Sequence, residues 1–287
     1  MFLLDKLQII AKHGKSNKQH IALLLLKHRF TIHRYSLQDF VKKSQCSRST
    51  VERFCKYLGY QRFTDLKTAI FDGLRSTAKT HEWLLNSNNI SDKDLLSYIF
   101  SHERSSLRNI ATIIQSVRYL QLLESLSKAE KVYILGAQAS SPMAHAYAYE
   151  IGKIHKNVIL IDYFNEITTH IISSANKQDI AFIFGFPRFP CTMIQFTKLL
   201  FERGCKNFLF SHTLGSDSPF QPYAHITFRI YLHYYGFTTG YSPLTALLSH
   251  IVLMYCRLYP KEAQESIRLF ESALHTCNNF YSSKRKT

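Results

Sequence analysis

Five short apolar segments, most of them separated by stretches with helical spacing, constrain the fold of this chain more than any other feature. Strands that alternate with helices form a parallel sheet whose two faces are covered. We therefore expect residues 92–287 to form an α/β domain with a five-stranded, mainly parallel sheet, in which a long helical stretch at 92–128 precedes the first strand. The segments are K-V-Y-I-L-G (131–136), N-V-I-L-I-D (157–162), D-I-A-F-I-F-G (179–185), N-F-L-F-S (207–211) and H-I-T-F-R-I (225–230).

The loops that follow these strands are the expected ligand-binding positions, because ligands of such sheets bind beyond the carboxyl ends of the strands. In the first loop Ser140 or Ser141 is expected to cap the next helix, with Pro142 at its first position. A helix N-terminus with hydroxyl groups suits a phosphate or another anion, although helix capping alone also explains these residues. The candidate loops are residues 136–141, 162–166, 185–190 and 211–218.

The N-terminal quarter of the chain carries most of its net positive charge. Of the 36 Lys and Arg residues, 15 lie within residues 1–75 beside 5 Asp and Glu, and the whole chain has a net charge of +16. A small basic domain is typical of a polyanionic partner, which nucleic acid, a ribosome or a membrane surface would each satisfy. A polar stretch rich in Asn and Ser follows. We expect a basic domain at 1–75, a linker at 76–91 and the α/β domain at 92–287.

Within the basic domain, residues 35–60 predict two short helices joined by a short polar turn. Ser36 and Asp39 form an N-cap pair for the first helix. Ser47 can cap the second helix, which ends at Gly59, a favourable residue just after a helix. Two short helices with such a turn are typical of a helix-turn-helix, whose second helix enters the major groove of DNA.

The second predicted helix has one apolar and one polar face. Its apolar stripe consists of Val51, Phe54, Cys55 and Leu58. Arg53 is the best candidate for a contact to guanine, and Glu52 could accept a hydrogen bond from a cytosine amine. An ordinary amphipathic helix with a solvated face shows the same spacing, and the high regional charge is what favours DNA. The candidate DNA-binding residues are Arg48, Ser49, Thr50, Glu52 and Arg53, with Lys42, Lys43, Lys56 and Arg62 expected to contact phosphates.

Other classes of protein are disfavoured. No apolar run is long enough to span a bilayer, and the N-terminus lacks the features of a secretory signal. The six cysteines show no C-x-x-C spacing, so we interpret them as small buried hydrophobes in a reducing, cytoplasmic compartment. The 14 histidines show no metal-ligand spacing, and we expect neither a metal nor a cofactor. No spacing singles out a catalytic base for an isomerase, although the residue types are available in Glu150, Glu166, His145 and His170.

The run C-S-R-S-T-V-E-R-F-C-K-Y-L-G-Y-Q-R-F-T-D-L-K, residues 46–67, resembles a motif of the RpiR/MurR-type bacterial transcriptional regulators. The family's motif is V-S-x-A-T-V-x-R-F-x-x-x-L-G-x-x-G-F-x-x-L-K, and Arg62 stands where its members usually have a glycine. Family members join an N-terminal helix-turn-helix domain to a C-terminal sugar isomerase (SIS) domain. The resemblance therefore implies a DNA-binding regulator rather than an enzyme. The matching residues are Ser47, Thr50, Val51, Arg53, Phe54, Leu58, Gly59, Phe63, Leu66 and Lys67.

The same resemblance implies a phosphosugar-type effector at the strand ends of the SIS domain. The family's first loop, G-x-G-x-S-S, corresponds to G-A-Q-A-S-S here, with Gln138 in place of the second glycine. Its second loop, S-x-S-G-x-T, corresponds to residues 185–190, where the hydroxyls are lost and Arg188 is left to hold an anion. The candidate ligand-binding residues are Gly136, Gln138, Ser140, Ser141, Gly185, Arg188 and Ser218.

Two hypotheses about the SIS domain stay open. Either it senses a phosphorylated sugar, or it is degenerate and only oligomerises or senses an atypical ligand. In both cases we expect a dimer or tetramer bound to a palindromic double-stranded DNA operator. The effector, the operator and the direction of regulation do not follow from the sequence.

Overall fold

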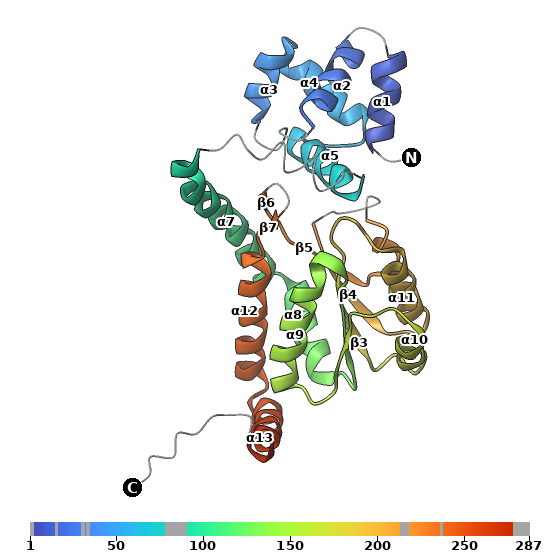
Figure 1. The fold of residues 1–287 in the computed structure, drawn as a ribbon, viewed down its shortest axis with the longest axis vertical. Helices are drawn as coiled ribbons and strands as arrows, with labels where there is room; N and C mark the ends of the chain where they lie inside the picture. Colours follow the sequence, from blue (N-terminus) through green and yellow to red (C-terminus); the bar gives the residue numbers. More distant parts are fainter. Residues whose placement is uncertain are drawn as a thin grey trace.

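A bundle of helices precedes an α/β domain in the part of the chain that the computed structural model describes, residues 3–14, 17–29, 32, 35–77, 91–212, 218–235 and 238–277 (Figure 1). Each bundle helix buries an apolar face, as with Ile21 and Leu25 in the second helix. The predicted linker at 76–91 falls largely outside the described residues, and the last bundle helix runs to Thr77. The helices of the bundle are α1 (Leu3–His13), α2 (Asn17–Lys27), α3 (Leu37–Ser44), α4 (Arg48–Tyr57) and α5 (Phe63–Thr77).

The predicted pair of short helices is confirmed as α3 and α4, and each begins with the expected cap. The Ser36 hydroxyl accepts a hydrogen bond from the backbone of Asp39 at 3.1 Å, and the Asp39 carboxylate accepts one from the backbone of Ser36 at 3.0 Å. The Ser47 hydroxyl accepts from the backbone of Thr50 at 3.2 Å. Gly59 follows α4 with φ 93°, in the left-handed region that only glycine adopts without strain. These caps define where the two helices begin.

The α/β domain contains a five-stranded sheet in which all strands are parallel, in the order β2-β1-β3-β4-β5. The predicted fold class and strand positions are thereby confirmed. The predicted long helix at 92–128 is two helices, α7 (Asp92–Ile114) and α8 (Val117–Lys128), because Ser116 caps the second one and accepts from the backbone of Tyr119 at 3.3 Å. The strands are β1 (Val132–Leu135), β2 (Val158–Ile161), β3 (Ile180–Phe184), β4 (Lys206–Ser211) and β5 (Ile226–Arg229).

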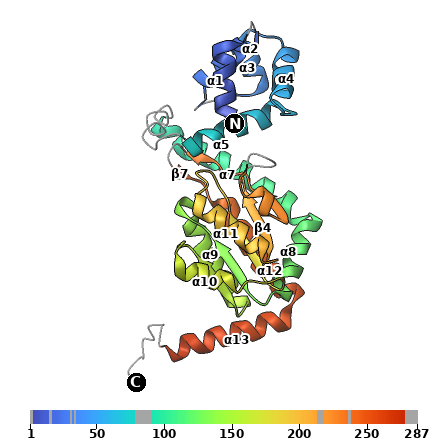
Figure 2. The same cartoon turned by 90° about the vertical axis from the view of Figure 1, so that its right-hand side faces the viewer.

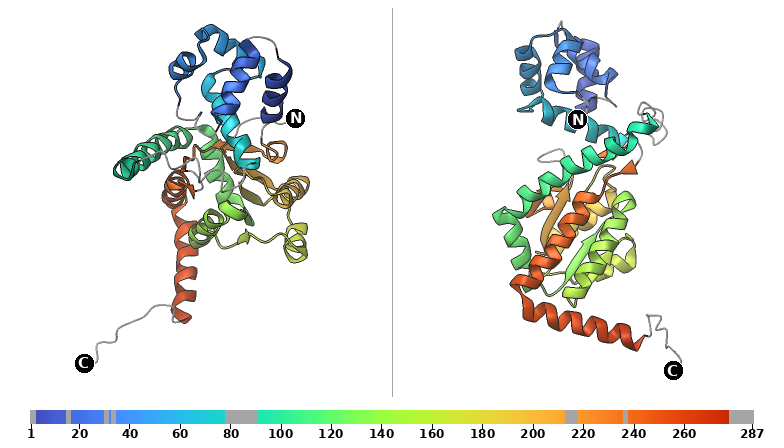
Figure 3. Two further views of the ribbon diagram at one scale, coloured as in Figure 1. Left: turned by 45° about the horizontal axis from the view of Figure 1, so that its top comes forward. Right: turned by 90° about the vertical axis from the view of Figure 1, so that its left-hand side faces the viewer.

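Helices cover both faces of this sheet (Figures 1 and 3). The side chains of β1 to β5 that point to one face pack with α8, α9 and α12, and those that point to the other pack with α10 and α11. Figure 2 shows α13 lying across the end of the domain that is remote from the bundle. The remaining elements are α9 (Ser141–Ile154), α10 (Glu166–Ser173), α11 (Cys191–Glu202), α12 (Ser242–Leu258), α13 (Pro260–Thr276), the hairpin β6 (Tyr234–Tyr235) and β7 (Thr238–Thr239), and the turns η2 (Gln138–Ser140) and η4 (Gln221–Tyr223).

An aromatic layer holds α9 and α12 to the sheet. The rings of Phe184 and Phe210 stack at 5.2 Å, and Tyr147 of α9 meets Phe184 edge-on at 4.7 Å. The Tyr147 hydroxyl donates to the carbonyl oxygen of Leu244 in α12 at 2.9 Å, so its one polar atom is satisfied in the core. The core directly beneath the strand ends is therefore largely aromatic.

The burial of the cysteines differs in part from the prediction. All six cysteines are free, and only Cys55 and Cys205 are buried. The prediction that all six are buried hydrophobes is therefore wrong for Cys191 and Cys277, which lie exposed at the start of α11 and just after α13. None of the described helices is long and apolar enough to cross a membrane.

His155 closes α9 and is only 7% exposed. Its Nε2 lies 3.0 Å from the carbonyl oxygen of Ala129, and its Nδ1 lies 3.3 Å from the backbone nitrogen of Asn157. The neutral ring with a proton on Nε2 satisfies both contacts, because Nε2 then donates and Nδ1 accepts. Burial lowers the pKa of His155, and the charge of Lys156 acts in the same direction.

The free energy of unfolding should therefore fall as the pH is lowered from about 7 to about 5. Below the ordinary histidine pKa of about 6.5 the unfolded chain takes up a proton that folded His155 resists, so its stabilising contribution is complete above that pH and lost below it. His155→Gln keeps a donor to Ala129 but cannot titrate, so it should lose less stability than the wild type in urea unfolding at the two pH values. His170→Gln, on the exposed side of α10, is the control, and equal losses in wild type and His155→Gln would contradict this role.

Candidate DNA-binding surface and ligand loops

Helix α4 divides into the two faces that its spacing predicts. Val51, Phe54 and Cys55 are buried and Leu58 is half-buried, against the rest of the bundle. On the opposite side the exposed residues are Ser49, Arg53, Lys56 and Tyr57. A helix held by its apolar face with its polar face open to solvent can enter a DNA groove without rearrangement.

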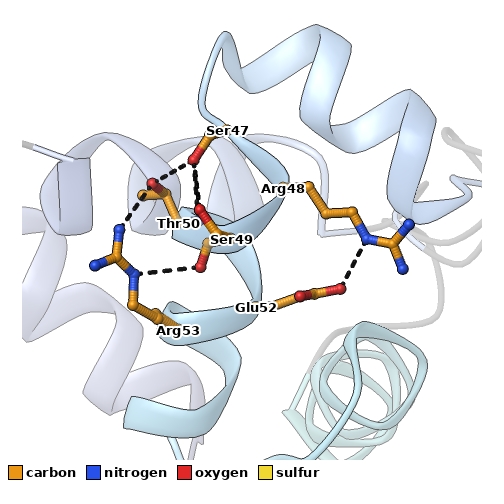
Figure 4. Close-up of polar contacts among 6 residues, drawn as sticks. All are labelled: Ser47, Arg48, Ser49, Thr50, Glu52 and Arg53. Carbon is orange, nitrogen blue, oxygen red and sulfur yellow. Dashed lines mark hydrogen bonds and ion pairs between the residues drawn. The ribbon is translucent and has the colours of Figure 1, made fainter.

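Arg53 lies along the N-terminal half of α4, as Figure 4 shows. Its Nε is 3.4 Å from the carbonyl oxygen of Ser49, and one terminal nitrogen is 3.5 Å from the Thr50 hydroxyl. Both hydrogen bonds are long, and no carboxylate pairs with Arg53 in the described part of the chain. The guanidinium group is thus available to a base edge at small cost.

Two other candidate arginines are paired with carboxylates. Arg48 Nε contacts Glu52 at 2.9 Å across one turn of α4, which occupies the Glu52 carboxylate that was predicted to accept from a base. Arg62 makes two contacts with Asp65, at 3.1 and 3.2 Å, and the hydrogen bond and charge of Asp65 raise the pKa of Arg62. A cavity of about 610 Å³ lies between α4 and α5, and its lining includes Arg48, Glu52, Lys56 and Arg62.

The remaining predicted phosphate contacts, Lys42 and Lys43, lie exposed in the last turn of α3. The structure adds a residue that the sequence reasoning missed. Lys18 of α2 places its ammonium group 3.7 Å from the ring centre of Tyr57, so it stands beside the exposed face of α4. Only the regional charge pointed to Lys18, because α2 precedes the helix pair and carries no motif.

The candidate ligand loops 136–141 and 185–190 follow the neighbouring strands β1 and β3. β1 lies between β2 and β3, and the helices that follow β1 and β3 pack on opposite faces. Such a topological switch point is where α/β sheets bind ligands. A Cβ atom at Gly136 would lie 2.6 Å from the Cβ of Ala144 and 2.8 Å from the carbonyl oxygen of Ser140, so glycine is required for the close approach of α9.

The predicted capping of α9 is wrong in detail. The helix is preceded by the turn η2, Ser140 makes no side-chain cap bond, and Pro142 is the second helical residue rather than the first. The Ser140 side chain is instead largely buried, at 6% exposure. Gln138 has φ 53°, a conformation that glycine adopts freely and other residues adopt at a cost. The backbone at Gln138 therefore has a conformation typical of glycine.

The second loop, residues 185–190, is filled by its own aromatic side chains. Phe186 is 8% exposed and joins the core, and the ring of Phe189 lies 6.0 Å from that of Phe220. Arg188 is exposed and has φ 85°, in the left-handed region. Near the loop, the Ser211 hydroxyl donates to the carbonyl oxygen of Gly185 at 2.7 Å.

Ser218 is the last candidate ligand residue. It is 1% exposed, and its hydroxyl has no hydrogen-bond partner among the described residues. Residues 213–217 of the same loop lie outside them. Ser218 is therefore a buried polar group that a partner would stabilise.

The candidate isomerase bases lie on two helices, α9 and α10. His145 contacts Asp162 at 2.7 Å, and Glu150 pairs with Lys153 at 2.8 Å. Glu166 begins α10, and His170 lies in its last turn. No group of three or more His, Cys, Asp or Glu in the described ranges could hold a metal ion.

Residues 1–77 match the helix-turn-helix domain of the rpiR family. The fold resembles two solved structures. The Vibrio vulnificus NanR protein, solved in complex with ManNAc-6P, is 19% identical over 96% of this chain and 98% of its own, with a TM-score of 0.57. The sugar isomerase domain of an RpiR transcription factor from Sphaerobacter thermophilus is 14% identical over 62% of this chain and 99% of its own, with a TM-score of 0.57. The α/β domain thus has the fold of a sugar isomerase domain.

Replacing Gln138 with glycine tests whether the first loop is strained. Gln138→Gly should raise the free energy of unfolding by about 0.5 kcal/mol, because relief of the left-handed backbone outweighs the entropy that glycine adds to the unfolded chain. The same substitution in the exposed middle of α8, Gln121→Gly, should lower it by about 1 kcal/mol. Urea unfolding measures both, and equal destabilisation by the two substitutions would show that Gln138 is not strained.

Proposed function

Because this chain carries a helix-turn-helix domain of the rpiR family at residues 1–77, we propose that it is a sequence-specific DNA-binding transcriptional regulator. The α/β domain is its effector domain, and sugar or amino-sugar metabolism is the process it regulates. The observation that carries the proposal is the exposed polar face of α4, with Arg53 held near its start and without a carboxylate partner in the described part of the chain. No isomerase activity is required by this function.

DNA binding divides between base contacts and phosphate contacts. Ser49 and Thr50 lie in the N-terminal half of α4, the part of a recognition helix that reads base edges, and the Arg53 side chain reaches back beside them. Lys42, Lys43 and Lys56 surround it and supply phosphate contacts, to which Lys18 adds a charge. Arg48 and Arg62 must share their charge with Glu52 and Asp65, so they contribute less attraction than their number suggests.

Self-association would place two recognition helices on a palindromic operator. The α/β domain exposes large apolar side chains that its own helices leave uncovered. Leu96 and Phe100 of α7 are each 61% exposed, and Leu253 of α12 is 62% exposed. Since α7 and α12 pack side by side, these residues mark the side of the domain on which a second copy would bind.

A phosphorylated amino sugar is the first effector to test, since the NanR protein of similar fold was solved in complex with ManNAc-6P. Within this chain Ser140, Ser141, Arg188 and Ser218 are the polar groups beside the switch point. The aromatic packing of the second loop favours the alternative, a domain that only oligomerises or that senses a different ligand. The thermal midpoint separates these two hypotheses.

Arg53→Ala should weaken binding to a specific duplex, selected by the protein from a random pool, by about 1–3 kcal/mol through loss of a base contact. Its affinity for random duplexes should fall far less. Arg118→Ala, on the exposed side of α8, removes an equal charge as the control. Fluorescence anisotropy at several salt concentrations measures both affinities, and the stoichiometry gives the number of chains on each duplex. If Arg53→Ala binds specific and random duplexes as the wild type does, α4 is not the recognition helix.

ManNAc-6P and other sugar phosphates should raise the thermal midpoint of the wild type if the switch point binds them, because ligand that binds only the folded state stabilises it by about 2.7 kcal/mol at one hundred times the Kd. Ser140→Ala and Arg188→Gln should reduce the shift, whereas Arg203→Gln at the end of α11 should retain it. No shift with any sugar phosphate would favour the degenerate domain.

A further inference from the structure

A second cavity lies between the DNA-binding bundle and the α/β domain. It has a volume of about 800 Å³, within the range of small-molecule sites. One wall is the start of α5, another is the middle of α7, and the third is the chain that leaves β4 and β5 at their carboxyl ends. None of the residues that line it belongs to the loops at 136–141 and 185–190. Its charged and titratable residues include Arg62, Asp65, Lys67, Arg108, His212 and Arg229.

Arg229 is the group in this cavity that most clearly lacks a partner. It is the last residue of β5, its guanidinium carbon lies 4.8 Å from the ring centre of Tyr231, and it is half-buried. Its Nε is buried and has no hydrogen-bond partner among the described residues. A buried donor without an acceptor is costly, and a charged one more so. An anion beside Arg229 would remove that cost.

Positive charge predominates in the lining. Among the described residues Arg62, Lys67, Arg108 and Arg229 line the cavity with one carboxylate, Asp65, which Arg62 already engages, and Lys67 also donates to the carbonyl oxygen of Tyr35 at 3.0 Å. Arg108 forms no ion pair with the described residues. The arginine guanidinium group binds a phosphate through two parallel N–H donors, as it also binds a carboxylate. The excess of positive charge is therefore matched to a phosphorylated ligand.

The wall formed by the α/β domain is held in place without a ligand. The backbone nitrogen of Tyr231 donates to the Asn109 side chain of α7 at 3.2 Å. His212, just after β4, is 7% exposed, and its Nδ1 lies 3.2 Å from the carbonyl oxygen of Ile230 and 3.3 Å from the nitrogen of Leu232, so in either tautomer it makes one of these two hydrogen bonds. A fixed wall means that a ligand need not pay to order it.

We propose that this cavity binds a phosphorylated small molecule, whose phosphate contacts Arg108 and Arg229 and whose polar part faces Ser105, Asn109 and Thr112. Sugar phosphates and nucleotides share this chemistry. The ligand would touch α5 on one side and β5 on the other, so its binding would favour one placement of the DNA-binding bundle relative to the effector domain. The binding site stands on the cavity alone, and its effect on DNA affinity rests on the proposed function.

Isothermal titration calorimetry of the full chain tests the site with glucose 6-phosphate, AMP and inorganic pyrophosphate, with glucose as the neutral reference. The wild type should bind at least one phosphorylated probe and not glucose, and the preferred probe identifies the source of the phosphate. Arg108→Gln/Arg229→Gln should weaken that binding about tenfold or more by removing two charged donors. Arg203→Gln/Arg268→Gln, which removes the same charge from exposed positions on α11 and α13, should bind as the wild type does. Arg108→Gln alone, at an exposed position, replaces the double variant if the latter fails to fold.

Three results would overturn the site. They are no binding of any probe by the wild type, equal weakening by both double variants, and loss of binding in Arg188→Gln but not in Arg108→Gln/Arg229→Gln. DNA binding without any probe is measured in parallel. A weaker duplex affinity of Arg108→Gln/Arg229→Gln with unchanged probe binding would make the cavity a DNA contact, and also overturns the proposal. Failure of the wild type to bind any duplex would instead contradict the proposed function and leave the titration intact.

Discussion

The position of β1 between β2 and β3 is the constraint on which the effector domain depends. Parallel strands with covered faces force each connecting helix to one side of the sheet. The helices α9 and α11 pack on opposite faces of the sheet, so the loops after β1 and β3 run in opposite directions and form the switch point. The backbone of Gly136 there passes close to Ala144. The strand order thus sets the positions of the loops after β1 and β3, and with them the polar side chains that these loops carry.

Two residues of these loops have a backbone conformation typical of glycine but carry long side chains. Gln138 and Arg188 both sit in the left-handed region, at φ 53° and 85°, where their side chains bring strain. Phe186 and Phe189 fill space beside β3 that a hydroxyl-rich loop would leave open. The switch point thus has the topology of a ligand-binding site, but aromatic side chains pack there. Two arginines of the effector domain, Arg108 and Arg229, line the other cavity instead, at the carboxyl ends of β4 and β5.

Helix α5 connects this second site to DNA binding. Its buried residues Phe63, Leu66 and Ile70 close the bundle that supports α4. Arg62, which immediately precedes α5, and Lys67 within it line both cavities. A ligand between α5 and β5 would therefore act on the element that supports the recognition helix, through rigid packing and without a flexible path.

Local patterns in the sequence determined the strands, the caps at Ser36 and Ser47, and the exposed side of α4, because continuous apolar runs and capping residues act on their own neighbours. The break at Ser116 escaped prediction, since apolar spacing continues through it. Only the tertiary structure decided which polar residues meet. Arg108 and Arg229 are far apart in the chain and no motif contains either, so their common cavity follows from the packing of α7 beside the end of β5.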